Sequence, residues 1–262
     1  MLPAPAGVSK IGGMTDTDLW VRRFHPADGA ATQLLCLSHA GGSASYFFGV
    51  SRALSPEIDV LSVQYPGRQD RLREPCLYSV ADLADGLVAA IEPLLTRPVT
   101  IFGHSLGATL GFEVALRLES AGVTPTALFA SGRTAPSRHR GGERTHLSDD
   151  AGLLKNVKAL GGTDTTLLDD EDVLRMVLPA IRADYTAAET YSYRPGTRVS
   201  CPVVALTGDR DPKVTVDEAS AWREHTTSDF DLVVYPGAHF FLNQHVADIL
   251  RRIRTHTRLI TA

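Results

Sequence analysis

The residues best suited to chemistry form the segment Gly103-His104-Ser105-Leu106-Gly107. This pattern, G-x-S-x-G, places a serine on a tight turn between a strand and a helix, with its hydroxyl exposed. The glycines at both ends relieve crowding where the backbone doubles back. A short apolar run, Val99 to Phe102, precedes the turn, and a helical pattern that reaches Ser120 follows it. The sequence therefore predicts Ser105 as a nucleophile.

A serine hydroxyl needs a base that removes its proton, and that base needs an orienting carboxylate. His239 follows the last expected strand in a loop of small residues and precedes the closing helix. We predict that His239 is the base. His245 falls inside the expected closing helix and His104 lies inside the turn, so both are interpreted as structural residues.

Two aspartates compete for the role of the carboxylate, after the strand expected at residues 202–206. In hydrolases with the chain order Ser, Asp, His, the acid leaves the end of a late strand. Asp211 stands far enough beyond the strand to turn back over the sheet, whereas Asp209 is typical of a side chain that bonds to its own turn. The prediction favours Asp211 and keeps Asp209 as the alternative.

A second turn, His39-Ala40-Gly41-Gly42, directly follows the apolar strand Leu34 to Leu37. It is similar to the His-Gly-Gly turns whose backbone N–H completes an oxyanion hole together with the residue after the nucleophile. We therefore expect the N–H groups of Ala40 and Leu106 to stabilise a developing oxyanion.

The composition is that of a soluble globular protein: 262 residues, 44% hydrophobic and 21% charged, with a net charge of −4. This acidic balance argues against nucleic acid as a partner. The three cysteines, Cys36, Cys76 and Cys201, form no metal-binding pair and suit a reducing cytoplasm. No apolar run approaches the ~20 residues of a membrane span. We expect a cytoplasmic protein without metal or membrane, in which residues 1–13 are a disordered leader or an expression remnant.

The elements that must position these residues alternate along the chain. Strands are expected at residues 19–24, 33–37, 58–63, 99–102, 126–130, 202–206 and 231–235, and helices at 44–54, 79–95, 107–120 and 242–256. Such alternation predicts a mostly parallel sheet with helices on both faces. Together with the serine turn, it indicates the α/β-hydrolase fold, as a single domain over residues 14–262.

The segment 132–200 interrupts this alternation, because it holds amphipathic helices near 147–159 and 171–192 and no convincing strand. Helices inserted between two strands are typical of an active-site lid. We expect its apolar sides to line an acyl pocket and the pairs Gly141-Gly142 and Gly161-Gly162 to let it move. The alternative is that these helices pack on the sheet as passive cover.

Several further segments give the chain a family resemblance: Ser38-His-Ala-Gly-Gly-Ser-Ala44, Gln64-Tyr-Pro-Gly-Arg68 with Arg71 and Glu74, Leu178-Pro-Ala-Ile-Arg-Ala-Asp-Tyr185, Gly208-Asp-Arg-Asp211 and Gly237-Ala-His-Phe-Phe-Leu242. With the serine turn, they make residues 19–256 resemble the type II thioesterases, free-standing α/β-hydrolases that accompany polyketide synthases and nonribosomal peptide synthetases. Leu106 and Ala238 stand where Met and Gly are common in that family, and Tyr65 where Leu is. These departures remove no catalytic group.

The resemblance implies an editing enzyme that hydrolyses acyl thioesters from the phosphopantetheine arm of acyl or peptidyl carrier proteins. It implies no cofactor other than the phosphopantetheine of the substrate, and only a transient encounter with the carrier. Carrier proteins are usually acidic, so a local basic patch is expected at the mouth of the site. The candidates are Arg68, Arg71 and Arg73, followed by Arg133, Arg138 and Arg140. The alternative is that these arginines are scattered solvated charges.

Two other functions remain open at this point. A carboxylesterase or lipase would use the same serine, histidine and aspartate, because fold and triad do not fix the leaving group. A hydrolase-fold binding protein would have lost catalysis altogether, against which the intact set of three residues argues.

Overall fold

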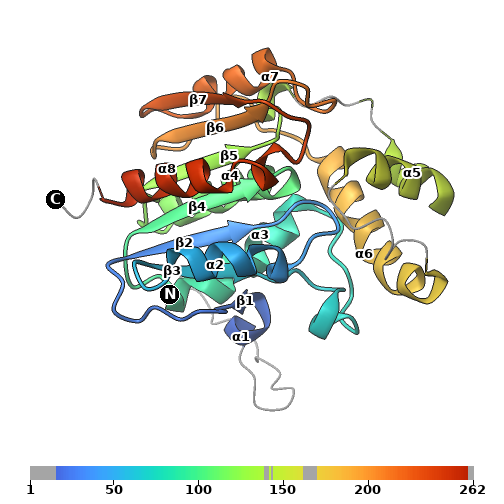
Figure 1. Ribbon diagram of the computed structural model, residues 1–262, viewed down its shortest axis with the longest axis horizontal. Coiled ribbons are helices and arrows are strands. Elements are labelled where there is room, and N and C mark those ends of the chain that lie inside the picture. Colours follow the sequence, from blue (N-terminus) through green and yellow to red (C-terminus); the bar gives the residue numbers. More distant parts are fainter. Residues whose placement is uncertain (1–15, 139–141, 143, 162–169, 259–262) are drawn as a thin grey trace, which may run out of the picture.

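The computed structural model describes residues 16–138, 142, 144–161 and 170–258. Within them, seven strands form one sheet in the order β1-β3-β2-β4-β5-β6-β7 (Figure 1). β1 pairs antiparallel with β3, and the other neighbouring strands are parallel. The strands are β1 Val21–Arg22, β2 Thr32–Leu37, β3 Ile58–Val63, β4 Val99–His104, β5 Ala127–Ser131, β6 Val203–Gly208 and β7 Phe230–Tyr235. The predicted mostly parallel α/β fold is confirmed.

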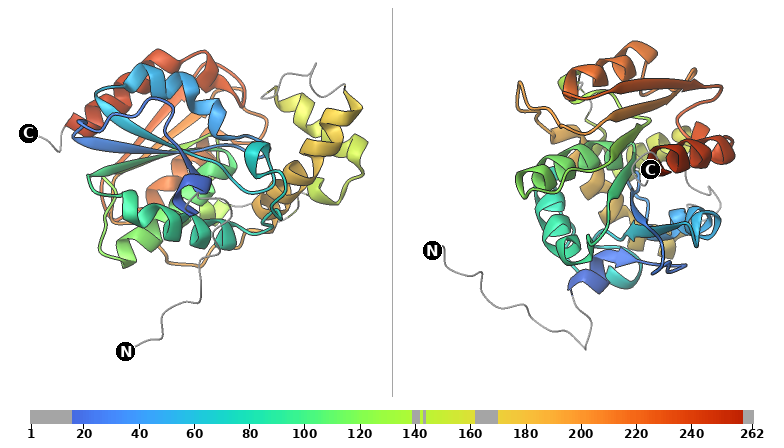
Figure 2. Two further views of the ribbon diagram at one scale, coloured as in Figure 1. Left: turned by 90° about the horizontal axis from the view of Figure 1, so that it is seen from below. Right: turned by 90° about the vertical axis from the view of Figure 1, so that its left-hand side faces the viewer.

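Helices cover both faces of this sheet (Figures 1 and 2). The α-helices are α1 Asp16–Trp20, α2 Phe48–Leu54, α3 Val80–Ile91, α4 Leu106–Ser120, α5 Asp150–Leu160, α6 Glu171–Thr190, α7 Val216–Ser220 and α8 Val246–Arg258. Short 3₁₀ helices are η1 Ala44–Phe47, η2 Gln69–Arg71, η3 Glu92–Leu94, η4 Pro136–Arg138, η5 Thr145–Leu147, η7 Ala221–His225 and η8 Phe241–Asn243. Helices α3 and α4 lie on one face, and α2 and α8 lie on the other.

Each face of the sheet carries its own apolar core. Under α3 and α4 the largest buried side chains include Phe112 and Trp222, and under α2 and α8 they include Phe47 and Phe129. All residues of the inner strands β2, β4, β5 and β6 are buried. This double burial explains why these strands are continuous apolar runs in the sequence rather than alternating ones.

Two expected elements differ from the structure. The strand expected at residues 19–24 is reduced to Val21–Arg22, because Asp16–Trp20 forms helix α1, from which Trp20 packs against Gly86 of α3. His245 does not lie inside the closing helix, since α8 begins at Val246. Its Nε2 lies 2.9 Å from the Pro236 carbonyl oxygen, so the ring fixes the preceding turn.

Helices α5 and α6 lie together beyond one end of the sheet, at the carboxyl ends of the parallel strands (Figures 1 and 2). They occupy the predicted insertion between β5 and β6. Helix α6 changes character at Pro179: most residues before it are exposed or half-buried, and most residues from Ala180 to Ala188 are buried. Residues 1–13, Gly141 and Gly162 lie outside the described residues, and the expected movement of this segment stays a prediction.

Candidate active site

Ser105 lies at the junction of β4 and α4 in a strained backbone conformation, with φ 55° and ψ −117°. A non-glycine residue in this region carries a cost that the surrounding structure must hold. The Ser105 N–H donates to the carbonyl oxygen of Ser131, at the end of β5, over 2.8 Å. Helix α4 begins at Leu106, and the first N–H groups of a helix have no partner within it. The turn therefore presents a serine hydroxyl beside a helix N-terminus.

The two glycines of the motif are required by close backbone contacts. A Cβ at Gly103 would lie 2.0 Å from the carbonyl oxygen of Gly107, and a Cβ at Gly107 would lie 2.2 Å from that of Leu37 in β2. Neither space admits a carbon atom. The motif thus packs the serine turn directly against β2, as the pattern predicts.

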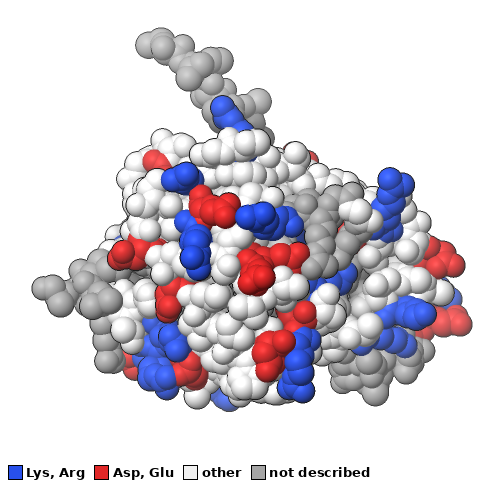
Figure 3. Space-filling view, turned by 90° about the horizontal axis from the view of Figure 1, so that it is seen from above, with Lys and Arg blue, Asp and Glu red and all other residues white. Residues whose placement is uncertain are grey.

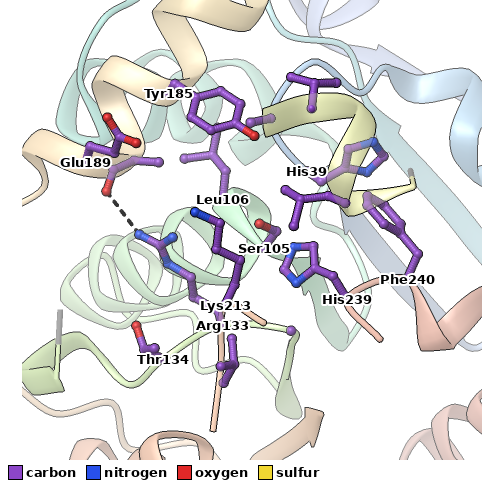
Figure 4. Close-up of a pocket in the computed structure, with 16 residues that line it drawn as sticks. His39, Ser105, Leu106, Arg133, Thr134, Tyr185, Glu189, Lys213, His239 and Phe240 are labelled. Atoms are coloured by element: carbon purple, nitrogen blue, oxygen red, sulfur yellow. Dashed lines mark hydrogen bonds between the residues drawn. The ribbon is translucent and has the colours of Figure 1, made fainter. Parts of the chain in front are cut away.

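His239 and Asp211 form a buried pair beside this turn. His239 Nδ1 lies 2.8 Å from Asp211 Oδ2, and the two side chains are 3% and 0% exposed. A carboxylate only accepts hydrogen bonds, so Nδ1 is the protonated nitrogen and Nε2 is left for another partner. The other oxygen, Asp211 Oδ1, accepts the N–H of Lys213 at 2.8 Å. Figure 4 shows the imidazole of His239 next to the side chain of Ser105.

Asp209, the alternative carboxylate, does not reach His239. Its Oδ1 accepts the N–H of Gly237 at 2.8 Å, and this hydrogen bond lowers the pKa of Asp209. Asp209 therefore ties the loop after β6 to the loop that carries His239. The structure brings Asp211 to the histidine, as the sequence favoured.

Two more histidines lie close to the pair but cannot share its role. Burial lowers the pKa of His39 to about 3 and lowers that of His104 well below its ordinary value. His104 Nδ1 is 3.0 Å from Ser131 Oγ, and its ring centroid is 5.1 Å from that of His239. Both rings stay neutral near neutral pH. This agrees with the structural interpretation of His104.

The turn that carries Ala40 lines the same pocket as Ser105 and His239. Four side chains distant in sequence hold it. The Tyr65 hydroxyl donates to the Ser38 carbonyl (3.1 Å), Gln64 Oε1 accepts the Ala44 N–H (2.9 Å), Arg68 donates to the Gly42 carbonyl (3.0 Å), and Asp184 accepts the Gly41 N–H (2.7 Å). Sequence reasoning missed these four roles, although the segments 64–68 and 178–185 contributed to the family resemblance.

The far wall of the pocket comes from the inserted helices and the loop after β5 (Figure 4). Its residues are Arg133, Thr134, Val157, Leu160, Tyr185, Ala188 and Glu189. Arg133 donates to the Ala188 carbonyl over 3.0 Å and so joins that loop to α6. The pocket is thus enclosed between the serine turn and both inserted helices.

The prediction that Arg68 and Arg71 belong to a docking patch for the carrier protein is wrong. Arg68 is 7% exposed and pairs with Asp184. Arg71 is 4% exposed, pairs with Glu74 and stacks on Trp20 at 4.5 Å. Neither guanidinium is open to a carrier protein, because each is the buried half of an internal ion pair.

The remaining arginines are distributed unevenly. Arg73 is exposed, Arg138 is exposed beside Glu224, and Arg133 lines the pocket instead of the surface. Arg140 lies outside the described residues.

Among the residues that the structure describes, no group of His, Cys, Asp and Glu is arranged to hold a metal ion. None of the described helices has the length and apolar character needed to cross a membrane.

Comparison with known proteins identifies the family. The thioesterase-domain family matches residues 32–257. Thioesterase PikA5 of Streptomyces venezuelae is 51% identical over 243 residues, covering 92% of this chain and 86% of that protein. The solved structure of the type II thioesterase BorB, from the borrelidin biosynthetic cluster, has 51% identity and a TM-score of 0.87, covering 91% of this chain and 98% of its own.

A more distant solved relative has the same architecture. YbtT, a type II thioesterase from the yersiniabactin NRPS/PKS pathway, has 28% identity and a TM-score of 0.81, covering 90% of this chain and 97% of its own. The chain therefore belongs to the thioesterase family, and it is a serine hydrolase of thioesters related to the type II thioesterases of polyketide and nonribosomal peptide biosynthesis.

Proposed function

We propose that Ser105, His239 and Asp211 form the catalytic triad with which this enzyme hydrolyses acyl groups from the phosphopantetheine arm of carrier proteins. The observation that carries the proposal is the buried 2.8 Å pair of His239 and Asp211 beside a strained serine turn. Acyl transfer by a serine hydrolase requires three groups: a serine at a helix N-terminus, a histidine whose Nδ1 is held by a hydrogen bond, and a buried carboxylate that holds it.

The first half of the reaction forms an acyl-enzyme. His239 takes the proton of Ser105, and the serine oxygen attacks the thioester carbonyl carbon. The carbonyl oxygen becomes an oxyanion, which the N–H groups of Ala40 and Leu106 stabilise. The C–S bond then breaks, and the proton on His239 passes to the departing phosphopantetheine sulfur.

The second half releases the acid. His239 takes a proton from water, and the resulting hydroxide attacks the ester carbon of the acyl-enzyme. The C–O bond to Ser105 breaks, and the serine recovers its proton from His239. Asp211 stabilises the imidazolium in both halves. Every group in this cycle is a side chain, a backbone N–H or water, so the chemistry calls for no cofactor beyond the pantetheine thioester itself.

The acyl chain is expected to lie along the inserted helices. Val157 and Leu160 of α5 and Tyr185 of α6 give that wall of the pocket an apolar part, beside the polar side chains of Arg133, Thr134 and Glu189. Its opposite side carries the serine turn. An acyl group bound between the two is shielded from water, which strengthens the interactions that stabilise the oxyanion.

We infer that the carrier protein docks transiently, in the cytoplasm where such synthases assemble their chains. On the face seen in Figure 3, Lys and Arg side chains alternate with Asp and Glu side chains rather than gathering in one basic patch. Of the arginines expected to dock the carrier, Arg73 and Arg138 are exposed, so we infer that a carrier meets single arginines. Contacts of this kind are weak and sensitive to salt, as a short encounter requires.

The proposal is tested with one acyl group presented as a carrier-protein thioester and as a p-nitrophenyl ester. We expect wild-type enzyme to favour the thioester in kcat/KM, Ser105→Ala to lose about 10³-fold or more of kcat, and exposed Ser228→Ala to keep full activity. A fluorophosphonate should label all but Ser105→Ala. Preference for the ester would indicate a carboxylesterase, and absence of labelling a binding protein.

A further inference from the structure

Asp184 lies in the buried half of α6, yet its carboxylate reaches across to the turn that carries Ala40. The residue is completely buried. Its Oδ2 accepts the Gly41 N–H at 2.7 Å. No step of the triad chemistry uses this carboxylate, so its burial beside the site calls for an explanation.

A second residue completes the arrangement. Arg68 binds both oxygens of Asp184, with Nη1 2.6 Å from Oδ2 and Nη2 2.8 Å from Oδ1. The same Nη1 donates to the Gly42 carbonyl over 3.0 Å. Burial by itself would lower the pKa of Arg68, but attraction to Asp184 raises it above the ordinary value. The pair is thus charged, bidentate and joined to both ends of the Gly41-Gly42 peptide segment.

The turn itself shows what this pair controls. The Gly42 N–H donates to the His39 carbonyl over 2.9 Å, which closes a four-residue turn over His39-Ala40-Gly41-Gly42. Gly41 has φ +77°, the value that a type II turn requires at its third residue. A type I turn differs by a flip of the central peptide between Ala40 and Gly41. Asp184 accepts the N–H of that central peptide and so favours one of the two orientations.

We propose that Asp184, held by Arg68, is a positioning residue that sets the oxyanion hole by fixing the peptide plane next to Ala40. This inference rests on the proposed function, in which the Ala40 N–H is one of the two oxyanion donors. The Ala40 N–H belongs to the preceding His39–Ala40 peptide, so the pair acts on it through the position of the whole turn. Without Asp184 and Arg68 the turn loses its contacts at the Gly41 N–H and the Gly42 carbonyl, and the donor is held less firmly. Oxyanion stabilisation depends steeply on donor placement, so the consequence falls on kcat.

The position of Asp184 on α6 adds a coupling between the lid and the chemistry. Ile181, one turn earlier, packs so closely on the turn that a Cβ at Gly41 would lie 2.9 Å from its Cγ1. The buried part of α6 therefore cannot shift without moving the oxyanion donor.

The test removes the ion pair as a whole, because deleting one partner leaves an uncompensated buried charge. The variant is Arg68→Met/Asp184→Leu, assayed with an acyl-N-acetylcysteamine thioester so that carrier docking plays no part. We expect kcat to fall about 100-fold with KM changed less than about threefold, the pattern of a lost transition-state interaction. The rate of fluorophosphonate labelling should fall with kcat.

The chain offers a matched control in Asp59, a buried carboxylate at the opposite end of the sheet. It binds Arg97 at 2.8 Å, Arg23 at 3.0 Å and the Ala27 N–H at 3.3 Å, a set of donors similar to that of Asp184. Arg97→Met/Asp59→Leu should lower the temperature of unfolding but leave kcat within about twofold of wild type, because no loop of the site depends on it.

Single variants keep the test decisive if the double variant does not fold. Asp184→Asn retains an oxygen for the Gly41 N–H, so it should keep at least about tenfold more kcat than Asp184→Ala. Unchanged kcat in folded Asp184 variants, or a rise in KM alone, would overturn the positioning role. That outcome would leave the proposed function intact as long as Ser105→Ala is inactive, so the two failures are distinguishable.

Discussion

The loops that carry the triad and the turn that carries Ala40 meet in one pocket but are held by different kinds of interaction. Backbone hydrogen bonds are the main ties of the triad loops, beside the bond of the Asp209 side chain to the Gly237 N–H. The N–H groups of Ser105, Asp209 and Arg210 donate to the carbonyls of Ser131, Tyr235 and Gly237 at 2.8 to 2.9 Å. These bonds extend the parallel sheet beyond its strands. The Ala40 turn is held from outside by the side chains of Gln64, Tyr65, Arg68 and Asp184.

This difference determines how each region responds to substitution. A backbone hydrogen bond survives most side-chain changes, so a triad loop fails when a catalytic group is lost or when a Cβ enters a space that only glycine leaves open. The Ala40 turn is vulnerable at a distance, through residues that never touch the substrate. Four substitutions test this comparison, from the largest expected effect to the smallest.

Asp211→Asn removes the group that fixes the tautomer of His239 and should lower kcat about 10⁴-fold. Asp209→Asn is the matched control, because Asp209 binds the Gly237 N–H and the Arg210 side chain instead of His239, and its effect should stay under about tenfold. The measurement is kcat with an acyl-N-acetylcysteamine thioester. A reversed order of the two variants would assign the catalytic carboxylate to Asp209.

Gly107→Ala places a Cβ 2.2 Å from the Leu37 carbonyl oxygen, which neither backbone can avoid. We expect a loss of about 3 kcal/mol in the free energy of unfolding, since overpacked backbone has no rotamer to change. Gly49→Ala in α2 is the control, because nothing lies within 4 Å of its Cβ, and it should stabilise the fold by up to about 1 kcal/mol. Equal urea midpoints for the two variants would contradict the steric account.

A buried histidine outside the triad lies in each region, His39 in the Ala40 turn and His104 in the serine turn. The pKa of His39 falls to about 3 and that of His104 falls well below its ordinary value, so both rings are neutral in the folded enzyme. The unfolded chain binds protons at these rings below about pH 6.5, so stability is lost as the pH falls. For His39 this loss is about 2 kcal/mol at pH 5.

His104→Gln should therefore reduce the difference in unfolding free energy between pH 7.5 and pH 5, because it removes a ring that takes up a proton only in the unfolded chain. Urea unfolding of the wild-type enzyme and the variant at the two pH values measures this change. An unchanged difference in the His104 variant would mean that this ring is already protonated in the folded protein.

The same comparison explains which parts of the molecule the sequence could predict. The serine turn, the strands and the choice of Asp211 follow from local signals: an apolar run, two glycines and a position after a strand. The clamp on the Ala40 turn depends on Arg68 and Asp184, which are 116 residues apart. Nothing in their local sequence shows that they meet, and Arg68 was therefore expected on the surface.

Helix α1 was missed for a similar reason. Residues 19–24 contain Trp, Val and Phe, which strands favour, but the contact of Trp20 with Gly86 of α3 decides the conformation of the segment that precedes β1. Tertiary packing outweighs a weak local preference at a sheet edge. The closing helix was expected to begin at about Leu242, but α8 begins at Val246. The His245 ring instead binds the Pro236 carbonyl oxygen, so His245 belongs to the turn before the helix.

The smallest expected effect concerns Tyr65. Its hydroxyl donates to the Ser38 carbonyl over 3.1 Å and is one of the four anchors of the Ala40 turn. The other three anchors remain when this bond is removed, so we expect only a small effect. Tyr65→Phe should cost about 1 kcal/mol in unfolding free energy and lower kcat about threefold.

Tyr193→Phe is the control that separates the loss of stability from the loss of kcat. The Tyr193 hydroxyl also donates to a backbone carbonyl, that of Thr197 at 2.8 Å, but Tyr193 lies outside the active-site pocket. It should lose about the same stability as Tyr65→Phe and no kcat. Thermal unfolding and turnover of the N-acetylcysteamine thioester measure the pair. If both variants lowered kcat alike, activity would follow global stability, and the Ala40 turn would not depend on its side-chain anchors more than any other loop does.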